Sequence, residues 1–568
     1  SEMCIRDRLM KKVKSLLSYM ILGMVFVAFN CFGAVKTTTG SAGGFGGPVT
    51  LEVVTEGEKI KDLKVVSHKE TSHLMDRAFP VIRERILEAQ SPVVDSVSGA
   101  SFTSFAVKKV VADVMKKEGK DFGRITFKTK APEQPAMIGE SVNTDIVIIG
   151  GGPAGLAAAI SAKEAGAKDV MIVEKLDILS GNGKFDMNFF DMINSKAQKA
   201  NGINDSIEAF IKDKSNPRDT AERTRVQAEG AYALDDWLRG MGINLNYNYG
   251  LRNHMAEADA YAGAHIQDGL ERKVKELGVD VRTGTKGLDF IMKDGKVTGV
   301  KVQKKNVTYD INAKAVIVAT GGFSANKALL AKYAPGSERV ETSNQMGATG
   351  DFVPVFEKNK MKMENMEVLS VFKMIISKTR DLTGAGDGFI LVNKNGERFI
   401  DETQSGLPMA YTILDQPESK VFYIYDQNLY ESAYRLKKHV GQGLHVKADT
   451  LEELADKLEI PKDKLVATVE TFNKGVRGEV KDPFKKEAFT REFKKQGPYY
   501  GVQVESAIHM TKGGVAANEK AEVLYEDGKI VEGLYAAGEV TNTSAAYSGA
   551  VVFGRVAGKS AAEFVKNR

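Results

Sequence analysis

The sequence predicts an α/β protein in which a small α+β domain precedes a Rossmann-like domain that carries an inserted α+β capping domain. The chain has 568 residues, more than one hydrophobic core usually fills, so several domains are expected. A short apolar run at 145–149 opens directly into a glycine-rich turn. Further along the chain, strand-like and helix-like segments between 322 and 533 break a regular βαβ alternation, which indicates an insertion.

Composition narrows the class of protein. With 43% hydrophobic and 27% charged residues, the chain is neither disordered nor a polytopic membrane protein. The net charge of +5 is small and dispersed, so we expect no nucleic-acid partner. The two cysteines, Cys4 and Cys31, both lie near the N-terminus. We therefore expect no disulfide, iron–sulfur cluster, c-type haem or other metal site in the body of the protein.

Residues 10–34 predict a secretory signal peptide. Basic residues follow Met10, and the apolar run at 16–29 is shorter than the ~20 residues that span a bilayer. Small residues at Gly33 and Ala34 suit cleavage by a signal peptidase. An uncleaved anchor is the alternative. The sequence thus predicts an extracytoplasmic location, in the periplasm or at the cell surface.

Residues 40–120 predict the small α+β domain. A Gly/Ser/Thr-rich stretch at 37–47 precedes two expected strands and two expected helices, and the second helix is expected at 105–117. Between the helices lies Asp-Ser-Val-Ser-Gly-Ala-Ser at 95–101, which could be a serine-rich helix N-cap. The segment also resembles the motif of FMN-binding domains, in which a flavin transferase joins FMN to the last hydroxyl through a phosphodiester. That resemblance implies covalent FMN on Ser101.

A dinucleotide-binding domain is expected over 144–366 and 507–568, after a polar linker at 121–143. The buried strand at 145–149 leads into Gly-Gly-Gly-Pro-Ala-Gly, an alanine-rich helix and a second strand that ends at Glu174. Glycines let the backbone approach a pyrophosphate, the helix N-terminus favours its charge, and Glu174 can accept hydrogen bonds from ribose hydroxyls.

Two later strand–glycine segments, 314–322 and 533–539, resemble the distal FAD-contacting segments of the fumarate reductase/succinate dehydrogenase flavoprotein superfamily, which includes flavocytochrome c. The order of domains resembles that of secreted urocanate-reductase-like flavoproteins. The resemblance implies non-covalent FAD and a capping domain at 367–506. The residues it places at FAD are Gly150, Gly152, Pro153, Ala154, Gly155, Glu174, Lys175, Gly181, Asn182, Gly183, Ala319, Thr320, Gly321, Gly322, Gly513, Gly514, Gly538, Glu539, Gly549, Ala550 and Val551.

The arginines that bind a dicarboxylate in this superfamily are absent where the resemblance places them. The proton-donating arginine falls near Gly406, and a carboxylate-binding arginine is replaced by Tyr547. Burying two carboxylates without partners would cost several kcal/mol, so the sequence argues against fumarate as substrate. Arg380 or Arg398 could be recruited instead, although Arg398 could equally pair with Glu402 inside the cap.

Three residues are the candidate catalytic groups. Tyr547 and His509 are expected to face the substrate, and Tyr411 is an alternative acid from the cap. Each could instead be a buried, merely hydrogen-bonded side chain. A tyrosine beside Gly-Ala also resembles the tyrosine and glycine that hold the carbonyl in 3-ketosteroid dehydrogenases of the same superfamily.

The resemblance implies an exported reductase of an activated C=C bond, in an enoate or enone, with hydride from FAD N5 and electrons entering through FMN. Its expected partners are a small-molecule electron acceptor, a membrane electron donor (a quinol or a flavoprotein) and the flavin transferase. Three alternatives remain open: a 3-ketosteroid-type dehydrogenase, a reductase of a non-alkene acceptor, and an electron carrier without a substrate site.

Overall fold

The structure is a computed structural model that describes residues 34–70, 74–129, 135–179, 181–184, 190–257, 260–541 and 546–568. The chain forms two compact units, Ser1–Pro132 and Glu133–Arg568, and the division falls inside the expected linker. Apart from Ala34, the predicted signal peptide lies outside the described residues. In the described part of the chain, no helix combines the length and the apolar character needed to span a membrane.

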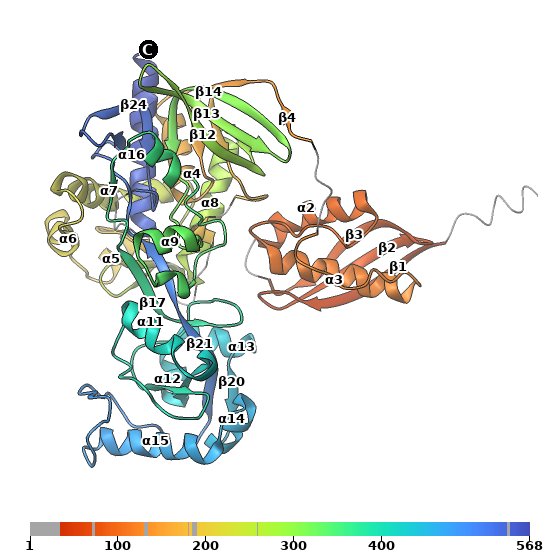
Figure 1. Ribbon diagram of the computed structural model, residues 1–568, viewed down its shortest axis with the longest axis vertical. Helices are drawn as coiled ribbons and strands as arrows, with labels where there is room; N and C mark the ends of the chain where they lie inside the picture. The colour runs from red at the N-terminus through yellow and green to blue at the C-terminus, as the bar shows by residue number, and fades with distance from the viewer. Residues whose placement is uncertain are drawn as a thin grey trace, which may run out of the picture. The chain divides into compact units, whose positions relative to one another are not determined.

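The first unit is an antiparallel sheet packed against two helices (Figure 1). The sheet order is β1-β2-β3, with β1 at Val35–Gly43, β2 at Pro48–Glu56 and β3 at Lys59–His68. Alternate residues of β2 are buried beneath helices α2 (Leu74–Ala89) and α3 (Ser101–Lys117), as the period of a half-buried strand requires.

Strand β1 was not predicted, because its Gly/Ser/Thr-rich sequence is typical of a linker. Helix α3 packs closely on this strand: a Cβ on Gly40 would lie 3.0 Å from the side chains of both Val110 and Val114. The glycine therefore serves a close helix–strand contact. Helix α3 also begins at Ser101, four residues earlier than expected.

The second unit is built on a nine-stranded sheet. Its parallel strands are β11 (Asp280–Arg282), β6 (Val170–Val173), β5 (Val142–Ile149), β14 (Val307–Val318) and β24 (Ile530–Ala536). The apolar runs of β5, β6 and β14 are buried on both faces where they pair, as parallel strands usually are. Because these strands are parallel, their carboxyl ends meet at one edge of the sheet.

Antiparallel strands extend the same sheet. Strands β12 (Thr285–Lys293) and β13 (Lys296–Lys304) continue from β14, and β23 (Glu522–Leu524) pairs with β24. The short strand β4 (Met137–Ile138) pairs with β14. Residues 137–143, expected as part of the linker, therefore join the sheet through β4 and the start of β5.

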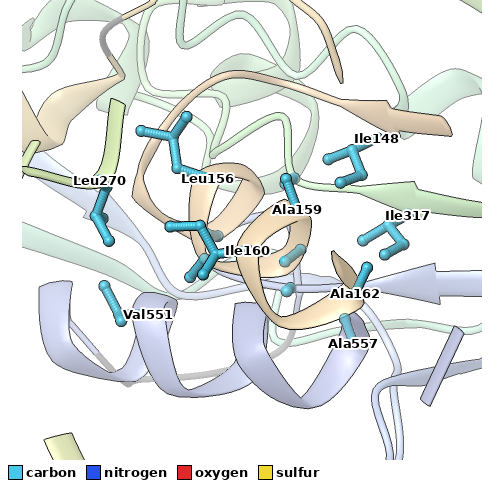
Figure 2. Packing of buried hydrophobic residues seen from close by; sticks show 14 of the residues in the cluster. Ile148, Leu156, Ala159, Ile160, Ala162, Leu270, Ile317, Val551 and Ala557 are labelled. Atoms are coloured by element: carbon cyan, nitrogen blue, oxygen red, sulfur yellow. The ribbon is translucent and has the colours of Figure 1, made fainter. Parts of the chain in front are cut away.

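Two helices pack backbone to backbone beside the sheet. Helix α4 (Pro153–Glu164) lies against α16 (Tyr547–Lys566), and α8 (Ala262–Glu276) covers another side of α4. Figure 2 shows the small and branched apolar side chains between them, from Leu156 and Ile160 of α4 to Val551 of α16. The C-terminal helix begins six residues before its expected start at Phe553.

The capping region is a second sheet, flanked by helices, whose strand order includes β15-β21-β19-β18, with β17 and β20 also paired to β21 (Figure 1). Strand β21 runs past the expected cap boundary at Ser506 and ends at Thr511. The strands of the capping sheet are β15 (Glu341–Thr342), β17 (Leu369–Ile376), β18 (Phe389–Asn393), β19 (Val421–Asp426), β20 (Val446–Ala448) and β21 (Tyr499–Thr511). The helices of the capping region are α11 (Gly406–Leu414), α12 (Gln427–Ser432), α13 (Tyr434–Gly441), α14 (Leu451–Leu458) and α15 (Lys462–Val476).

The remaining elements of the second unit surround the large sheet. They are β7 (Phe190–Asp191), β8 (Tyr247–Tyr249), β9 (Asn253–Glu257), β10 (Ala260–Tyr261), β16 (Met363–Glu364), β22 (Gly514–Val515), the 3₁₀ helix η1 (Asn182–Lys184), α5 (Lys196–Ala200), α6 (Ile207–Lys214), α7 (Ala221–Gly240), α9 (Lys327–Tyr333) and α10 (Val353–Lys358).

Candidate functional site

A cavity of about 420 Å³ lies in the second unit where the parallel strands end. The residues directly after β5, β6, β14 and β24 all line it. Open α/β sheets bind ligands in this position, outside the carboxyl ends of their strands. The loops that the sequence singled out are therefore brought together by the topology of the sheet.

The glycine turn after β5 gives the cavity a wall of bare backbone. Gly150 has a φ of 111°, and a Cβ there would overlap the carbonyl oxygen of Ala319. At Gly152, the N-cap of α4, an added Cβ would meet only Gly181, at 3.5 Å. Gly152, Pro153 and Ala154 thus bring the N-terminus of α4 to the cavity wall, and a helix N-terminus suits the charge of a pyrophosphate.

The carboxylate of Glu174 borders this turn at the end of β6. Its Oε2 accepts a hydrogen bond from the backbone N–H of Gly151 (2.7 Å), and its Oε1 accepts one from that of Leu176 (2.8 Å). Glu174 is buried and lines the cavity, where it can also accept a ribose hydroxyl. Next to it, Lys175 forms an ion pair with Asp351 at 2.7 Å.

The loops after β14 and β24 form the opposite wall. Glu539 is half-buried there and accepts hydrogen bonds from Thr511, through its backbone N–H at 2.9 Å and its hydroxyl at 3.2 Å. Burial raises the pKa of Glu539 to about 7. The hydroxyl oxygen of Thr320 is buried and has no hydrogen-bond partner among the described residues. The glycine cradle, the ribose-binding carboxylate and this unpartnered hydroxyl fit an FAD molecule.

The loop at 181–184 is tied to the capping sheet through Asn182 and Asn344. The two side-chain amides are hydrogen-bonded to each other, and Asn182 also accepts the backbone N–H of Gln345 (3.0 Å). Asn344 in turn donates to the backbone carbonyl of His509 (3.0 Å). The expected flavin-contacting loop and the candidate catalytic histidine are thus linked by one hydrogen-bonded chain.

His509 lines the cavity from near the end of β21. Its Nδ1 is hydrogen-bonded to the Ser343 hydroxyl at 2.9 Å, and its ring centre lies 5.6 Å from that of Phe372. Burial, together with the nearby charge of Arg435, lowers the pKa of His509 below its usual value near 6.5. The imidazole is therefore mainly neutral at neutral pH.

Arg435 of α13 is an arginine that the sequence analysis did not expect at the site. It lines the cavity, and its guanidinium carbon lies 5.7 Å from the centre of the Phe372 ring. Its Nε is buried and has no hydrogen-bond partner in the described part of the chain. The positions near Gly406 and at Tyr547 carry no arginine, as expected, but a cap helix beginning 28 residues after Gly406 supplies Arg435 to the cavity wall. No local sequence signal marks it; only the packing of the cap reveals it.

Arg380 and Arg398, which the sequence analysis considered for recruitment, are both engaged elsewhere. Arg380 donates to the backbone carbonyls of Thr342 and Asn344, at 3.2 Å each. Arg398 pairs with Glu402 (2.8 Å) and Asp482 (2.6 Å) inside the cap. The interpretation of Arg398 as a structural residue of the cap agrees with this geometry.

Tyr547 is the first residue of α16 and lines the cavity. Its hydroxyl donates to the backbone carbonyl of Gly263 (3.1 Å), and its ring packs edge-on against Phe190. Burial raises its pKa further above the usual range. Tyr411 lies on α11 and is not among the described residues that line the cavity; its ring packs beneath Arg339 instead. The structure therefore brings Tyr547 and His509 to the cavity but not Tyr411.

Most of the residues expected at FAD line the cavity, and six do not. An added Cβ on Gly514 would overlap Val540, and one on Gly322 would overlap Thr511, so these two serve close packing. The predicted residues in the lining are Gly150, Gly152, Pro153, Ala154, Glu174, Lys175, Gly181, Asn182, Gly183, Ala319, Thr320, Gly321, Gly538, Glu539 and Ala550; Gly155, Gly322, Gly513, Gly514, Gly549 and Val551 are not in it. Lining residues that the sequence analysis missed include Asp191, Asn253, Thr285, Lys286, Gln345, Asp351, Phe372, Leu382, Arg435 and Met510.

The first unit presents Ser101 at the exposed start of α3. The N-cap, Ala100, makes no side-chain cap, so the serine-rich segment is not a simple cap and the first N–H groups of α3 can meet a phosphate. The neighbouring ring of Phe102 is 45% exposed and lies 5.4 Å from that of Phe127. An exposed hydroxyl at a helix N-terminus beside exposed aromatic rings fits a tethered flavin phosphate.

Comparison with known proteins agrees with both sites. Residues 145–551 match the model of the FAD binding domain, and residues 44–116 match that of the FMN-binding domain. The chain is 30% identical to NADH:fumarate oxidoreductase of Klebsiella pneumoniae, over 91% of this chain but only 57% of that protein's length. It is also 30% identical to urocanate reductase of Eggerthella lenta, over 92% of each chain. A flavocytochrome c3 fumarate reductase in its open conformation superimposes with a TM-score of 0.70 and 32% identity, covering 75% of this chain and 79% of that one.

The fold and the cavity define a flavoprotein with one domain for FMN and one for FAD. The chain belongs to the family of FAD-binding flavoproteins that includes fumarate and urocanate reductases. The expected fold class, the family resemblance and the presence of domains for both flavins are confirmed, whereas the covalent linkage of FMN stays a prediction.

Proposed function

We propose that this protein is a flavin-dependent reductase of an activated C=C bond, an oxidoreductase acting on CH–CH groups. One observation carries the proposal: the FAD cradle and the pair His509 and Arg435 line one continuous cavity. A substrate in this cavity would lie between a hydride source and two polar side chains. The relatives described above, which reduce fumarate or urocanate by name, agree with this chemistry.

In this proposal, bound FAD supplies a hydride to one carbon of the double bond, and the protein supplies a proton to the other. Of the three candidate acids, His509 fits best. Tyr411 is not among the described lining residues, and the hydroxyl of Tyr547 is already donated to Gly263. Ser343 holds Nδ1 of His509, so the ring presents Nε2 as the atom from which a proton would be delivered.

The low pKa of His509 sets the expected pH dependence. A group with a lowered pKa is protonated only at lower pH, and its protonated form is a stronger acid. If His509 delivers the proton, kcat is highest at mildly acidic pH and falls as the pH rises through the lowered pKa of His509. His509→Asn should remove this limb of the profile and lower kcat by about 10²-fold or more.

We also propose that electrons reach FAD from FMN joined to Ser101 by a phosphodiester, and that a flavin transferase attaches it. The exposed position of Ser101 supports access by such an enzyme. A membrane quinol or flavoprotein as donor, and an extracytoplasmic location, follow from the sequence of residues 10–34 and stay proposals. Fractionation of cells that express the full chain would test the location.

The function is tested with protein that carries both flavins, using reduced methyl viologen as electron donor. The substrates are fumarate, urocanate, 3-phenylacrylate and a ketosteroid with a conjugated double bond. We expect at least one alkene to oxidise the viologen and to yield the saturated product, with loss of turnover in His509→Asn. Failure of every conjugated alkene, with FAD fully bound, would contradict the proposal.

A further inference from the structure

We propose that Arg435 binds the carboxylate of a substrate with one carboxylate group and an apolar or aromatic body; this inference rests on the proposed function and specifies the substrate class. Lys175 and Lys286 both line the cavity, and both are paired with Asp351, at 2.7 Å and 3.1 Å. Arg435 is the remaining lining lysine or arginine, and it has no ion pair among the described residues.

Arg435 carries a buried hydrogen-bond donor without an acceptor, as an anion-binding group does before its ligand binds. Its Nε is buried without an acceptor, which costs about 1–3 kcal/mol unless a bound ligand accepts the hydrogen bond. A guanidinium and a carboxylate match in shape and can form two parallel hydrogen bonds. A carboxylate at this position would therefore satisfy both the charge and the buried donor.

The neighbours of Arg435 in the wall favour an apolar or aromatic body next to that carboxylate. The ring of Phe372 contacts both groups: its centre lies 5.7 Å from the guanidinium carbon of Arg435 and 5.6 Å from the imidazole centre of His509. Leu382 and Met510 also line the cavity, and His509 is mainly neutral at neutral pH. A flat apolar group can stack on such a surface, whereas a second charge would be desolvated without a partner.

Charge matching also argues against a dicarboxylate. One unpaired guanidinium neutralises one carboxylate. Arg380 and Arg398 already hold carbonyl and carboxylate groups of the protein. Arg491, whose Nε also has no hydrogen-bond partner among the described residues, is not among the described residues that line the cavity. A second buried carboxylate would cost several kcal/mol. We therefore expect selectivity for a monocarboxylate, because Arg435 is the one described lysine or arginine of the cavity wall without an acidic partner.

A buried network holds the helix that carries Arg435. The hydroxyl of Thr383, next to the lining residue Leu382, is 3.1 Å from Nδ1 of His439 and 3.1 Å from Nε2 of His445. His445 is also bonded to the hydroxyl of Tyr425 on β19 (2.8 Å). Because His439 follows Arg435 by one helical turn, this network fixes α13 against the segment that contains Leu382. The guanidinium is thus presented from a rigid support.

Equilibrium binding to the oxidised, FAD-loaded protein tests the inference without turnover. The probes are 3-phenylpropanoate, 3-phenylpropanamide and succinate, and the signal is the change in FAD absorbance. We expect the wild-type protein to bind the phenyl carboxylate at least about 10-fold more tightly than either the amide or succinate. Equal binding of amide and carboxylate, or tighter binding of succinate, would overturn the inference, and this comparison needs no variant.

A matched pair of variants adds a second measurement. Arg435→Gln should weaken binding of 3-phenylpropanoate by about 10- to 100-fold and leave binding of the amide nearly unchanged. Lys437→Gln removes the same charge from an exposed position on α13 and should change neither. Unchanged carboxylate binding in Arg435→Gln would refute the role of Arg435. If carboxylates bind as expected but no alkene is reduced, the proposed function fails and the role of Arg435 in binding stands. If alkenes are reduced but carboxylates are not preferred, the proposed function stands and the role of Arg435 fails.

Discussion

Gly554 of α16 lies so close to Ala154 of α4 that a Cβ on the glycine would overlap the carbonyl oxygen of Ala154. The same relationship recurs one turn later between Gly558 and Ala158. The backbones of α4 and α16 thus touch, and the first residues of both helices line the cavity. The position of the pyrophosphate-binding turn therefore depends on glycines about 400 residues away in the sequence.

Gly554→Ala should push α16 from α4 and destabilise the second unit by about 1–3 kcal/mol, as overpacking usually does. We expect weaker FAD retention as well, because α4 carries the cradle. Urea unfolding and FAD release by gel filtration measure both effects. Gly240→Ala, at the end of α7 where an added Cβ meets nothing within 4 Å, is the matched control. An equally stable Gly554→Ala protein would contradict the packing described here.

Tyr547→Phe separates a structural role from a catalytic one. The change removes one hydrogen bond, to the Gly263 carbonyl at the start of α8, so we expect a loss of stability of about 0.5–1.5 kcal/mol. Because the hydroxyl is already engaged, kcat should stay within about threefold of wild type. A fall of about 10²–10⁴ in kcat, the usual contribution of a general acid, would instead identify Tyr547 as the proton donor.

The buried histidines of the cap predict a dependence of stability on pH. Burial lowers the pKa of His439 to about 2 and that of His445 to about 3, whereas an unfolded histidine has a pKa of about 6.5. Between these values the unfolded state binds more protons, so stability falls as the pH falls below about 6.5. Each histidine should lower the free energy of unfolding by about 2 kcal/mol between pH 7 and pH 5.

Urea unfolding of the second unit at several pH values measures this effect. His445→Gln should reduce the loss of stability between pH 7 and pH 5 by the contribution of one histidine, about 2 kcal/mol. His68→Gln, at an exposed position of the first unit, should leave the loss of stability unchanged. A His445→Gln protein whose stability falls between pH 7 and pH 5 as steeply as that of the wild type would show that His445 is not buried and neutral.

Ser101→Ala should abolish covalent flavin in protein that is co-expressed with a flavin transferase. Flavin fluorescence of the denatured protein on a gel reports the linkage. Ser101→Thr keeps a hydroxyl and should keep the flavin, and Ser41→Ala, an exposed serine of the same unit, should have no effect. Retained fluorescence in Ser101→Ala would assign the flavin to another residue.

Local sequence patterns predicted the large sheet well. One βαβ unit contains the apolar runs of β5 and β6, the glycine turn and Glu174. These features lie close together in sequence, so a local pattern can predict the binding site that they form. Strand β1 was missed because Gly40 serves a contact with a helix 70 residues away rather than a turn. Residues 137–143 were missed in the same way, because they pair with β14.

The part of the cavity proposed to bind substrate was predicted less completely, because segments distant in the sequence pack together to form it. Arg435, Phe372 and His509 come from one helix and two strands, and no periodicity links them. Tyr411 carries suitable chemistry, but α11 does not bring it into the described wall of the cavity. The family resemblance thus pointed to His509, whereas only the folded cap places Arg435 in the wall.

The most direct measurement mixes the chemically reduced, two-flavin protein with 3-phenylacrylate in the absence of oxygen and follows flavin absorbance. We predict that the flavin is reoxidised and that one equivalent of 3-phenylpropanoate forms for each electron pair released. A flavin that stays reduced with this and every other conjugated alkene would contradict the central claim that the cavity reduces C=C bonds.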